Sequence, residues 1–367
     1  MARYIYQLTD WPRFTWDNEA IISLLSEVRN KQGRLTGKME AIGFTIQDQA
    51  LLETLSKDIL TSSEIEGEYL NTTQVRSSIA RKLGVDIGGL VESSREVEGV
   101  VEMTLDATQH CDQELTKDRL FSWHAALFPT GRSGMYKIQV GQWRDDSTGP
   151  MQVVSGPMGK ETVHFQAPPA DCLQHEMDLF LDWLNAGHTT DPVIDAAIAH
   201  LWFVTIHPFD DGNGRIARAI TDMMLCRSEN KARRFYSMSS QINEHRKDYY
   251  DILEKTQKGS LDITSWIVWF LECLEKAIDA SASTVENILA KHSFWYKHRA
   301  DTFNDRQTKM IDLLFGNFHG KLTTSKWAKI NKCSTDTALR DIQDLVDKDV
   351  LHRSDSGGRS THYELLL

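Results

Sequence analysis

Apolar residues recur with a helical period along most of the chain. One apolar stripe consists of Ile21, Leu24, Leu25 and Val28, and similar stripes occur throughout the sequence. A spacing of three and four residues places these side chains on one face of a helix, where they can pack against a core. The pattern therefore predicts a mainly α-helical fold.

One segment departs from this period. The runs MQVVS and ETVHF, between residues 151 and 165, are rich in β-branched residues and are separated by Gly156, Pro157 and Gly159. Two β-prone runs around a Gly- and Pro-containing turn predict a β-hairpin. The Ala-Pro-Pro sequence at 167–169 should end the second strand and lead into a helix near 171–185.

The most apolar segment begins at Pro192 and reads PVIDAAIAHLWFVTI. It predicts a helix buried on most of its circumference, with proline at its first turn, where the missing N–H costs least. The sequence HPFDDGNG then interrupts the helix, and a second helix runs through Arg227. Further helices are expected at 266–278 and 285–289, with 281–284 forming either a turn or a polar helix face.

Length and charge limit the classes of function. The chain has 367 residues, a formal net charge of −11 and five scattered cysteines, none in a CxxC pair. Such a charge argues against an extended nucleic-acid or anionic-membrane surface, and the cysteines favour reduced thiols. Without a signal-peptide core or a long apolar stretch, the protein is expected to be cytoplasmic.

Chemically useful residues concentrate at 207–218, HPFDDGNGRIAR. Gly212 and Gly214 precede a helix start, where backbone N–H groups can approach an anion. Arg215 and Arg218 follow three residues apart, so both guanidinium groups can bind the same phosphates. Asp211 supplies a carboxylate oxygen of the kind Mg²⁺ prefers. His207 titrates near neutral pH and can accept a proton from a hydroxyl.

This segment resembles the HPFx(D/E)GNGRxxR signature of the Fic family. The resemblance implies a nucleotidyltransferase in which a Ser, Thr or Tyr hydroxyl of a target protein attacks the α-phosphate of ATP and pyrophosphate leaves. It implies His207 as the base, Asp211 as the Mg²⁺ ligand and Phe209 as a buried anchor. The residues implied to bind ATP are Gly212, Asn213, Gly214, Arg215, Ile216, Ala217 and Arg218.

A metal site is the alternative interpretation of this segment. His200 lies seven residues before His207 and could suggest a pair of metal ligands. A zinc site needs further Cys, His or carboxylate ligands at short spacing, and the sequence supplies none. The phosphate-binding interpretation is therefore preferred.

The segment 62–67, Ser-Ser-Glu-Ile-Glu-Gly, resembles the (S/T)xxxE(G/N) inhibitory motif of many Fic proteins. The resemblance implies that Ser62 and Glu66 form a brake in which Glu66 pairs with Arg218 and keeps ATP from binding productively. It also suggests a second activity, in which the enzyme removes AMP from modified targets. The same spacing could instead be a capping box, with Ser63 and Glu66 marking a helix start.

Family resemblance assigns two further groups of residues. The hairpin would act as a flap that aligns the target's main chain by strand addition, with the purely structural hairpin as the alternative. Its expected docking residues are Val154, Ser155, Gly156, Val163, His164 and Phe165. Tyr249, Tyr250 and Gln257 resemble the residues that enclose adenine.

The C-terminal stretch reads as two helices, a turn, a third helix and a Gly-rich hairpin, which resembles a winged helix. Its expected recognition helix, 334–348, has four aspartates against Arg340 and Lys348, which disfavours major-groove docking. Because the wing contains Arg353 and Arg359, an alternative function remains: a DNA-binding regulator whose Fic core senses a nucleotide without transferring it. The nearer alternative is a Fic enzyme that uses another donor and transfers UMP, phosphocholine or a phosphate group.

The expected organisation has four parts: a helical N-terminal region with the inhibitory motif (1–115), a Fic catalytic domain (116–280), a linker helix (281–304) and a winged-helix domain (305–367). The function expected is transfer of AMP from ATP to a target protein and to the enzyme itself, with Mg²⁺. A homodimer is a further expectation, DNA is disfavoured as a partner, and no membrane contact is expected.

Overall fold

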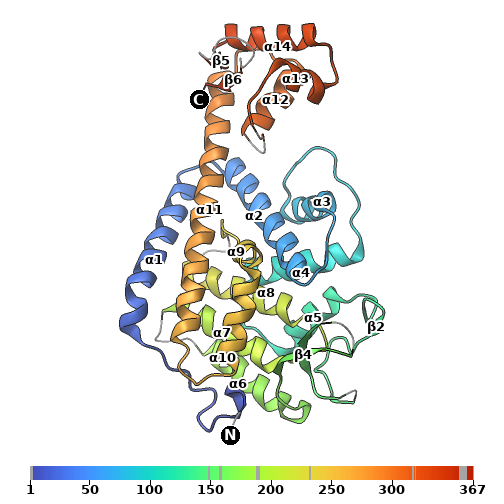
Figure 1. Cartoon of the computed structure of the whole chain (residues 1–367), viewed down its shortest axis with the longest axis vertical. Coiled ribbons are helices and arrows are strands. Elements are labelled where there is room, and N and C mark those ends of the chain that lie inside the picture. The colour runs from blue at the N-terminus through green and yellow to red at the C-terminus, as the bar shows by residue number, and fades with distance from the viewer. Residues whose placement is uncertain are drawn as a thin grey trace. The chain divides into compact units, whose positions relative to one another are not determined.

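A computed structural model describes residues 3–147, 149–156, 159–186, 191–230, 233–315, 318, 320–354 and 362–366. The chain forms two compact units, Met1–Ser281 and Ala282–Leu367. Each unit is mainly helical, as the hydrophobic period predicts (Figure 1). The four-part division of the chain stays a prediction. In the described part of the chain, no helix is both long and apolar enough to cross a membrane.

The first unit is built from helices with two short hairpins between α5 and α6. In chain order it contains η1 (Ile5–Gln7), α1 (Asn18–Glu40), α2 (Phe44–Ile65), α3 (Thr72–Leu83), α4 (Arg95–Gln109), α5 (Lys117–Leu127), β1 (Arg132–Ser133), β2 (Tyr136–Lys137), β3 (Gln152–Ser155), β4 (Thr162–Gln166), η2 (Ala170–Cys172), α6 (Leu173–Asn185), α7 (Pro192–Ile206), α8 (Asn213–Glu229), α9 (Met238–Glu244) and α10 (Arg246–Gln257).

The helix α11 (Thr264–Lys297) begins in this unit and runs without interruption through residues 281–284. The sequence is compatible with either a turn or a polar helix face here, and the structure shows a helix. Residues 281–284 contain neither Gly nor Pro, so nothing in the backbone forces a break. Gly33 and Gly37 lie within α1, and a Cβ at either position would meet no atom within 4 Å.

Helices α7 and α8 form the centre of the first unit. Every residue of α7 after its initial proline is buried, including the polar Asp195, His200 and Thr205. Buried polar groups require partners, and His200 has two, Thr221 Oγ1 and Tyr249 OH, each at 2.8 Å. His200 is thus a structural core residue. Among the described residues, no group of three or more His, Cys, Asp or Glu side chains could hold a metal ion.

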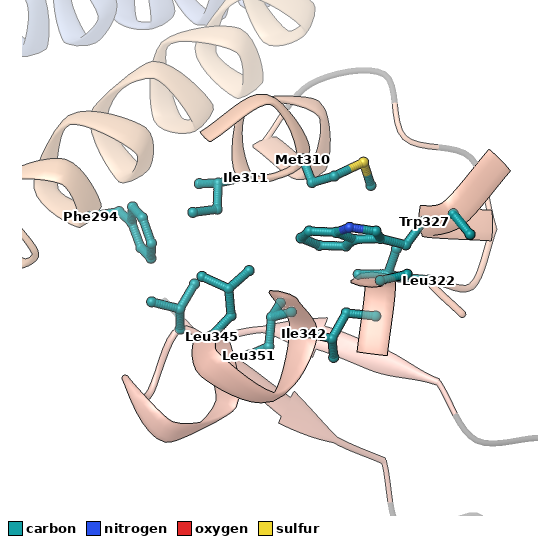
Figure 2. Packing of buried hydrophobic residues seen from close by; sticks show 11 residues of the cluster. Phe294, Met310, Ile311, Leu322, Trp327, Ile342, Leu345 and Leu351 are labelled. Carbon is teal, nitrogen blue, oxygen red and sulfur yellow. The ribbon is translucent and has the colours of Figure 1, made fainter. Parts of the chain in front are cut away.

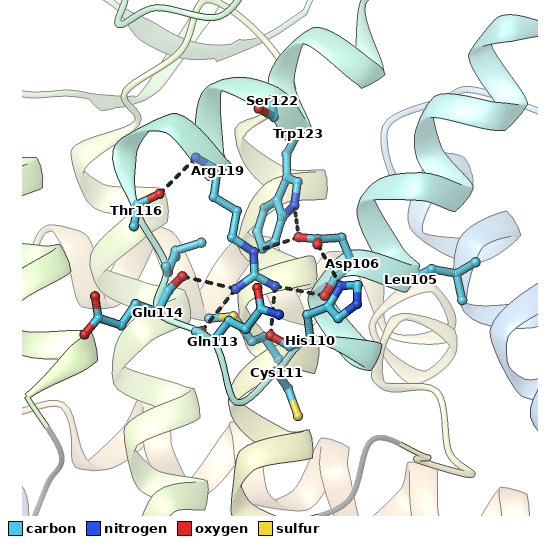
Figure 3. A network of polar contacts seen from close by, with 12 residues as sticks. Leu105, Asp106, His110, Cys111, Gln113, Glu114, Thr116, Arg119, Ser122 and Trp123 are labelled. Atoms are coloured by element: carbon cyan, nitrogen blue, oxygen red, sulfur yellow. Dashed lines mark hydrogen bonds and ion pairs between the residues drawn. The ribbon is translucent and has the colours of Figure 1, made fainter. Parts of the chain in front are cut away.

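The partly buried Arg119 of α5 hydrogen-bonds to the end of α4 (Figure 3). Arg119 Nε donates to Asp106 Oδ2 at 2.7 Å, and its other nitrogens donate to the carbonyls of Asp106, His110, Gln113 and Glu114. Trp123 Nε1 donates to the same Asp106 oxygen at 2.7 Å. The network joins the last turn of α4 and the segment after it, which contains His110, Gln113 and Glu114, to α5.

The predicted hairpin at 151–165 is present as β3 and β4. The strands pair antiparallel with Val153 opposite Phe165 and Ser155 opposite Thr162, and a bulge falls between Val153 and Val154. Phe165 is buried, and its ring packs edge-on against Tyr4 at 5.1 Å between centroids. The segment before α1 therefore supports the base of the hairpin, a contact that the local sequence did not indicate.

The second unit has its own core. In chain order it contains the end of α11, then α12 (Asp305–Phe315), α13 (Thr324–Asn331), α14 (Thr335–Asp347), β5 (Leu351–Arg353) and β6 (Tyr363–Leu365). Buried side chains from these helices and from β5 pack in one cluster, which includes Phe294 of α11 and the 0% exposed Trp327 of α13 (Figure 2). This order of helices and strands is the one that the sequence predicted, whereas Arg359 lies outside the described residues. The winged-helix assignment itself stays a prediction.

Two of the four aspartates expected on the recognition helix contact side chains of α12. Asp341 Oδ2 accepts from Arg306 Nε at 2.7 Å, and Asp344 Oδ2 accepts from Gln307 Nε2 at 2.7 Å. These contacts join α14 to α12. Part of the acidity of α14 therefore has a structural role.

Candidate active site

The end of α7 presents His207. The chain leaves the helix there with φ 53° and ψ 58°, and the His207 N–H still donates to Phe203 O at 3.0 Å. A positive φ is uncommon for a non-glycine residue and is a feature of functional sites when the surroundings enforce it. His207 is the C-cap of α7 and is less buried than residues 193–206 of the helix.

The imidazole of His207 is partly buried and held in one orientation. Nδ1 lies 3.2 Å from Val204 O, and because a carbonyl oxygen only accepts, Nδ1 must carry the hydrogen. Burial lowers the pKa of His207 to about 4, which favours the neutral ring at physiological pH. Nε2 is then the basic nitrogen, as a proton acceptor requires.

Two side chains fix the loop that follows His207. Asn213 spans the loop, since its Oδ1 accepts from Phe209 N at 3.0 Å and its Nδ2 donates to Phe209 O at 2.7 Å. The Phe209 ring is fully buried and stacks on His124 with 4.2 Å between centroids. Phe209 is therefore the buried anchor that was expected, while the Asn213 side chain holds the loop together.

Arg144 holds the same loop from outside it. Its Nε donates to His207 O at 2.8 Å, its Nη2 to Pro168 O at 2.6 Å, and its backbone N–H to Pro208 O at 2.9 Å. The residue is 3% exposed. Sequence reasoning missed Arg144, because nothing near residue 144 in the chain signals a contact with residues 207 and 208.

The loop ends at an open helix N-terminus. Gly212 adopts φ 80° immediately before α8, and a Cβ there would lie 2.9 Å from Phe128 Cε2. Since glycine offers no side chain to cap the helix, the first N–H groups of α8 remain available to an anion, and the helix dipole adds to the attraction. The structure thus has an uncapped helix start behind a glycine at the expected phosphate cradle, and phosphate binding there stays a prediction.

Arg215 and Arg218 project from the first turns of α8 and are 2% and 3% exposed. In the described part of the chain, Arg215 Nε and Arg218 Nη1 are buried nitrogens without a hydrogen-bond partner. Buried charged donors left unsatisfied are costly unless a ligand completes them. Ile216 and Ala217 are fully buried, so their side chains face the core and only their backbone lies near the cradle.

The expected pairing of Glu66 with Arg218 is present. Arg218 Nη2 donates to Glu66 Oε1 at 2.7 Å and to Ser62 O at 2.9 Å, and Arg218 Nε donates to Ser62 Oγ at 2.8 Å. The capping-box alternative is wrong, because α2 ends at Ile65 and Glu66 is its C-terminal cap. Residues 62–66 thus lie at the end of a helix, not at its start.

A second ion pair lies beside the first. Arg215 Nη1 contacts Glu68 Oε2 at 2.5 Å, and the Arg215 guanidinium lies over the Phe128 ring at 5.0 Å from its centroid. Burial raises the pKa of the Glu68 carboxyl, while Arg215 acts in the opposite direction. Sequence reasoning missed Glu68, although a carboxylate two residues after Glu66 was a visible signal.

Asp211 lies at the edge of the cradle. The Ser133 hydroxyl hydrogen-bonds to Asp211 Oδ2, and the His124 ring approaches Asp211 O at 3.2 Å. A single carboxylate beside a phosphate site suits Mg²⁺, which usually takes one or two carboxylates and completes its shell with phosphates and water. The residues present therefore fit this ion when a nucleotide supplies the remaining ligands.

The hairpin residues expected to form the flap have different surroundings. Val154 is 49% exposed, whereas Phe165 is buried. Ser155 Oγ hydrogen-bonds to His164 Nε2 at 2.6 Å, and His164 Nδ1 pairs with Glu254 Oε2 of α10 at 2.6 Å. The hairpin is thus attached to α10 by His164 and to the N-terminal segment by Phe165. Gly156 and Val163 lie at its turn end and in β4.

The three residues expected near adenine are not equally accessible. Tyr249 is 2% exposed and bonds to His200, while Tyr250 is 37% exposed beside Arg246. Gln257 is 5% exposed, and its Nε2 lies 3.3 Å from Thr205 Oγ1. Of the three, only Tyr250 has a surface-exposed ring. Tyr249 and Gln257 are buried and hydrogen-bond to α7, through His200 and Thr205.

Comparison with known proteins places the candidate site within a recognised domain. Residues 114–225 match the Fic/DOC family, and residues 4–85 match a domain of unknown function, DUF4172. A protein adenylyltransferase Fic of Drosophila erecta is 28% identical over 254 residues, covering 67% of this chain and 46% of the relative. Its counterpart in Nematostella vectensis is 27% identical over 238 residues, covering 63% and 50%.

The chain thus spans about half the length of the curated relatives it matches. A crystal structure of a Fic family protein from Desulfovibrio desulfuricans G20 aligns over 97% of this chain and 98% of its own, with a TM-score of 0.56 and 22% identity. That likeness concerns the fold. Residues 114–225 are a Fic/DOC domain, homologous to that of the Fic protein adenylyltransferases.

Proposed function

We propose that this chain is a protein adenylyltransferase that moves AMP from ATP to a Ser, Thr or Tyr hydroxyl and is restrained by Glu66. The observation that carries the proposal is the pair of buried arginines, Arg215 and Arg218, at the open N-terminus of α8. Unsatisfied guanidinium nitrogens and free backbone N–H groups together form a site for a polyphosphate.

His207 supplies the proton acceptor for the reaction. Its Nδ1 hydrogen is directed at Val204 O, so Nε2 takes the proton of the attacking hydroxyl while the hydroxyl oxygen bonds to the α-phosphorus. The bond from the α-phosphorus to its bridging oxygen breaks, and pyrophosphate leaves with that oxygen. The negative charge of the leaving group is stabilised by the α8 N-terminus and the two arginines.

Asp211 is the residue that would hold Mg²⁺. When bound with the nucleotide, the ion neutralises phosphate charge and helps to orient the leaving group. The hydroxyl of Ser133 and the N–H of Gly212 orient the Asp211 carboxylate. Orientation of a ligand by its neighbours is a common requirement of metal sites.

Glu66 restrains the reaction by occupying Arg218. A guanidinium that donates to Glu66 Oε1 and to Ser62 cannot at the same time bind the phosphates in fork geometry. ATP must displace this carboxylate or bind without Arg218. The brake is therefore a competition between a carboxylate of the chain and a phosphate of the substrate.

The test is intact-mass analysis after incubation with Mg²⁺ and ATP, or with UTP, GTP or CTP in its place. Wild-type protein is compared with Glu66→Gly, His207→Ala and the double variant. We expect an adduct of one or more AMP groups with ATP, more of it in Glu66→Gly, and none in either protein that carries His207→Ala.

A different result would redirect the proposal. An adduct from another triphosphate would identify another donor, and full modification in His207→Ala would exclude His207 as the base. If no protein is modified by any triphosphate, a purified target is required, and failure with every target would favour a nucleotide-sensing regulator.

A further inference from the structure

The ion pair between Glu68 and Arg215 is not part of the inhibitory contact between Glu66 and Arg218 described above. Arg215 is 2% exposed on its side chain, and Glu68, whose side chain is 43% exposed, is the carboxylate partner of Arg215. Arg215 Nε, by contrast, has no partner in the described part of the chain. Each of the two arginines of the cradle is therefore held by its own glutamate from the same short segment.

The backbone explains why both glutamates reach α8. The N–H of Glu68 donates to Ser63 O at 3.0 Å, the N–H of Gly67 donates to Glu64 O at 2.9 Å, and Gly67 has φ 81°. These two bonds around a left-handed glycine form a Schellman motif at the end of α2. Glu66 and Glu68 flank the glycine, so one rigid turn presents both carboxylates to the cradle.

We propose that Glu68 is a second element of the brake, which occupies Arg215 as Glu66 occupies Arg218, and that the turn 66–68 releases both arginines together. This inference rests on the proposed function, since it concerns binding of ATP phosphates at the same site. A partly exposed carboxylate on a buried arginine is suited to this role, because a phosphate can reach and replace it.

One consequence distinguishes this arrangement from a brake with a single glutamate. Removal of Glu66 frees Arg218 but leaves Arg215 paired with Glu68. Nucleotide binding in a Glu66 variant should then remain below its maximum until Glu68 is also neutralised. Glutamine is the suitable replacement for both residues, because it keeps the side-chain length and removes the charge.

The experiment measures the dissociation constant of Mg-ATP by calorimetry in the full chain carrying His207→Ala, which prevents turnover. Glu66→Gln, Glu68→Gln and their combination are added to this background. Glu272→Gln, a change at an exposed glutamate of α11, is the matched control. We expect Glu68→Gln to tighten binding about fivefold or more, a typical size for a coupling of this kind.

We also expect the combined variant to bind more tightly than Glu66→Gln alone. The proposal is overturned if Glu68→Gln binds as the Glu272→Gln control does while Glu66→Gln tightens binding. It is also overturned if Glu68→Asp, which keeps the charge, tightens binding as much as Glu68→Gln does. Melting temperatures of all variants show whether each is folded.

Titration with inorganic tripolyphosphate separates this inference from the proposed function. Tighter tripolyphosphate binding in Glu68→Gln, with no AMP transfer by any variant that retains His207, would support release of Arg215 and reject the transferase. AMP transfer that increases in Glu66→Gly but is unchanged by Glu68→Gln, with unchanged tripolyphosphate binding, would support the transferase and reject the role of Glu68.

Discussion

Glu66 Oε1 occupies the space next to Gly214 that any larger residue would need. A Cβ built on Gly214 would lie 2.2 Å from this oxygen and 3.2 Å from Arg218 Nη1. The glycine therefore does more than leave the backbone open to an anion. It also makes room for the carboxylate that pairs with Arg218.

Gly214→Ala should break the contact of Glu66 with Arg218. We expect the free energy of unfolding to fall by about 1–3 kcal/mol, as for other cases of overpacking. In a Glu66→Ala background, the same change should cost less, because the carboxylate is gone and only the contact with Arg218 Nη1 at 3.2 Å remains, while alanine favours the helix. Urea denaturation of the four proteins checks this, and equal losses in both backgrounds would contradict the explanation.

Gly67 should control the brake through its backbone. Gly67→Ala places a side chain at φ 81°, which costs about 1–2 kcal/mol and distorts the turn that carries Glu66 and Glu68. We expect AMP transfer to increase and the melting temperature to fall. Gly67→Asn is the matched control, since asparagine tolerates this conformation, and its activity should stay near that of wild type.

Arg144 should position His207 without touching substrate. Arg144→Lys keeps a positive charge but loses the fork that reaches His207 O and Pro168 O. We expect kcat for AMP transfer to fall about 10- to 100-fold, as expected when a reacting group is slightly misplaced. The affinity for Mg-ATP should change little, and an equal loss in affinity and kcat would indicate general damage to the site.

Acid should destabilise the first unit through its buried histidines. Burial lowers the pKa of His124 to about 4 and that of His200 to about 3, below the value near 6.5 of an unfolded chain. Between these values the unfolded chain binds more protons, so the free energy of unfolding decreases as the pH falls from about 6.5 to 4. At pH 4.5 each imidazole should account for a loss of about 2–3 kcal/mol.

Urea denaturation at pH 7 and near pH 4.5 measures this loss. His200→Gln removes one titrating group from the core, so the protein carrying it should lose less stability between the two pH values than wild type does. An unchanged loss in that variant would show that His200 does not contribute to the acid sensitivity.

Much of the candidate site was predictable because its determinants are local. The helix before His207, the glycine loop and the helix after it follow from the apolar run, the proline at 192 and the glycines at 212 and 214. The hairpin at 152–166 follows from two β-prone runs around a turn. In each case the hydrogen bonds and backbone angles involve residues close together in the chain.

The partners of the functional side chains depended on the tertiary structure. Arg218 meets Ser62 and Glu66 more than 150 residues earlier in the chain, and local spacing at 62–66 fitted a helix start as well as a helix end. Packing of α2 against the rest of the unit decides which groups face α8. Resemblance to a known motif, rather than any local pattern, made this contact predictable.

The sequence by itself determined the elements, the uncapped start of α8 and the position of His207, because backbone preferences and hydrophobic period act over a few residues. Only the tertiary structure decided that Glu68 holds Arg215, that Arg144 holds His207, and that Tyr249 and Gln257 are buried. These contacts join distant segments, and they form only when burial of apolar surface brings those segments together.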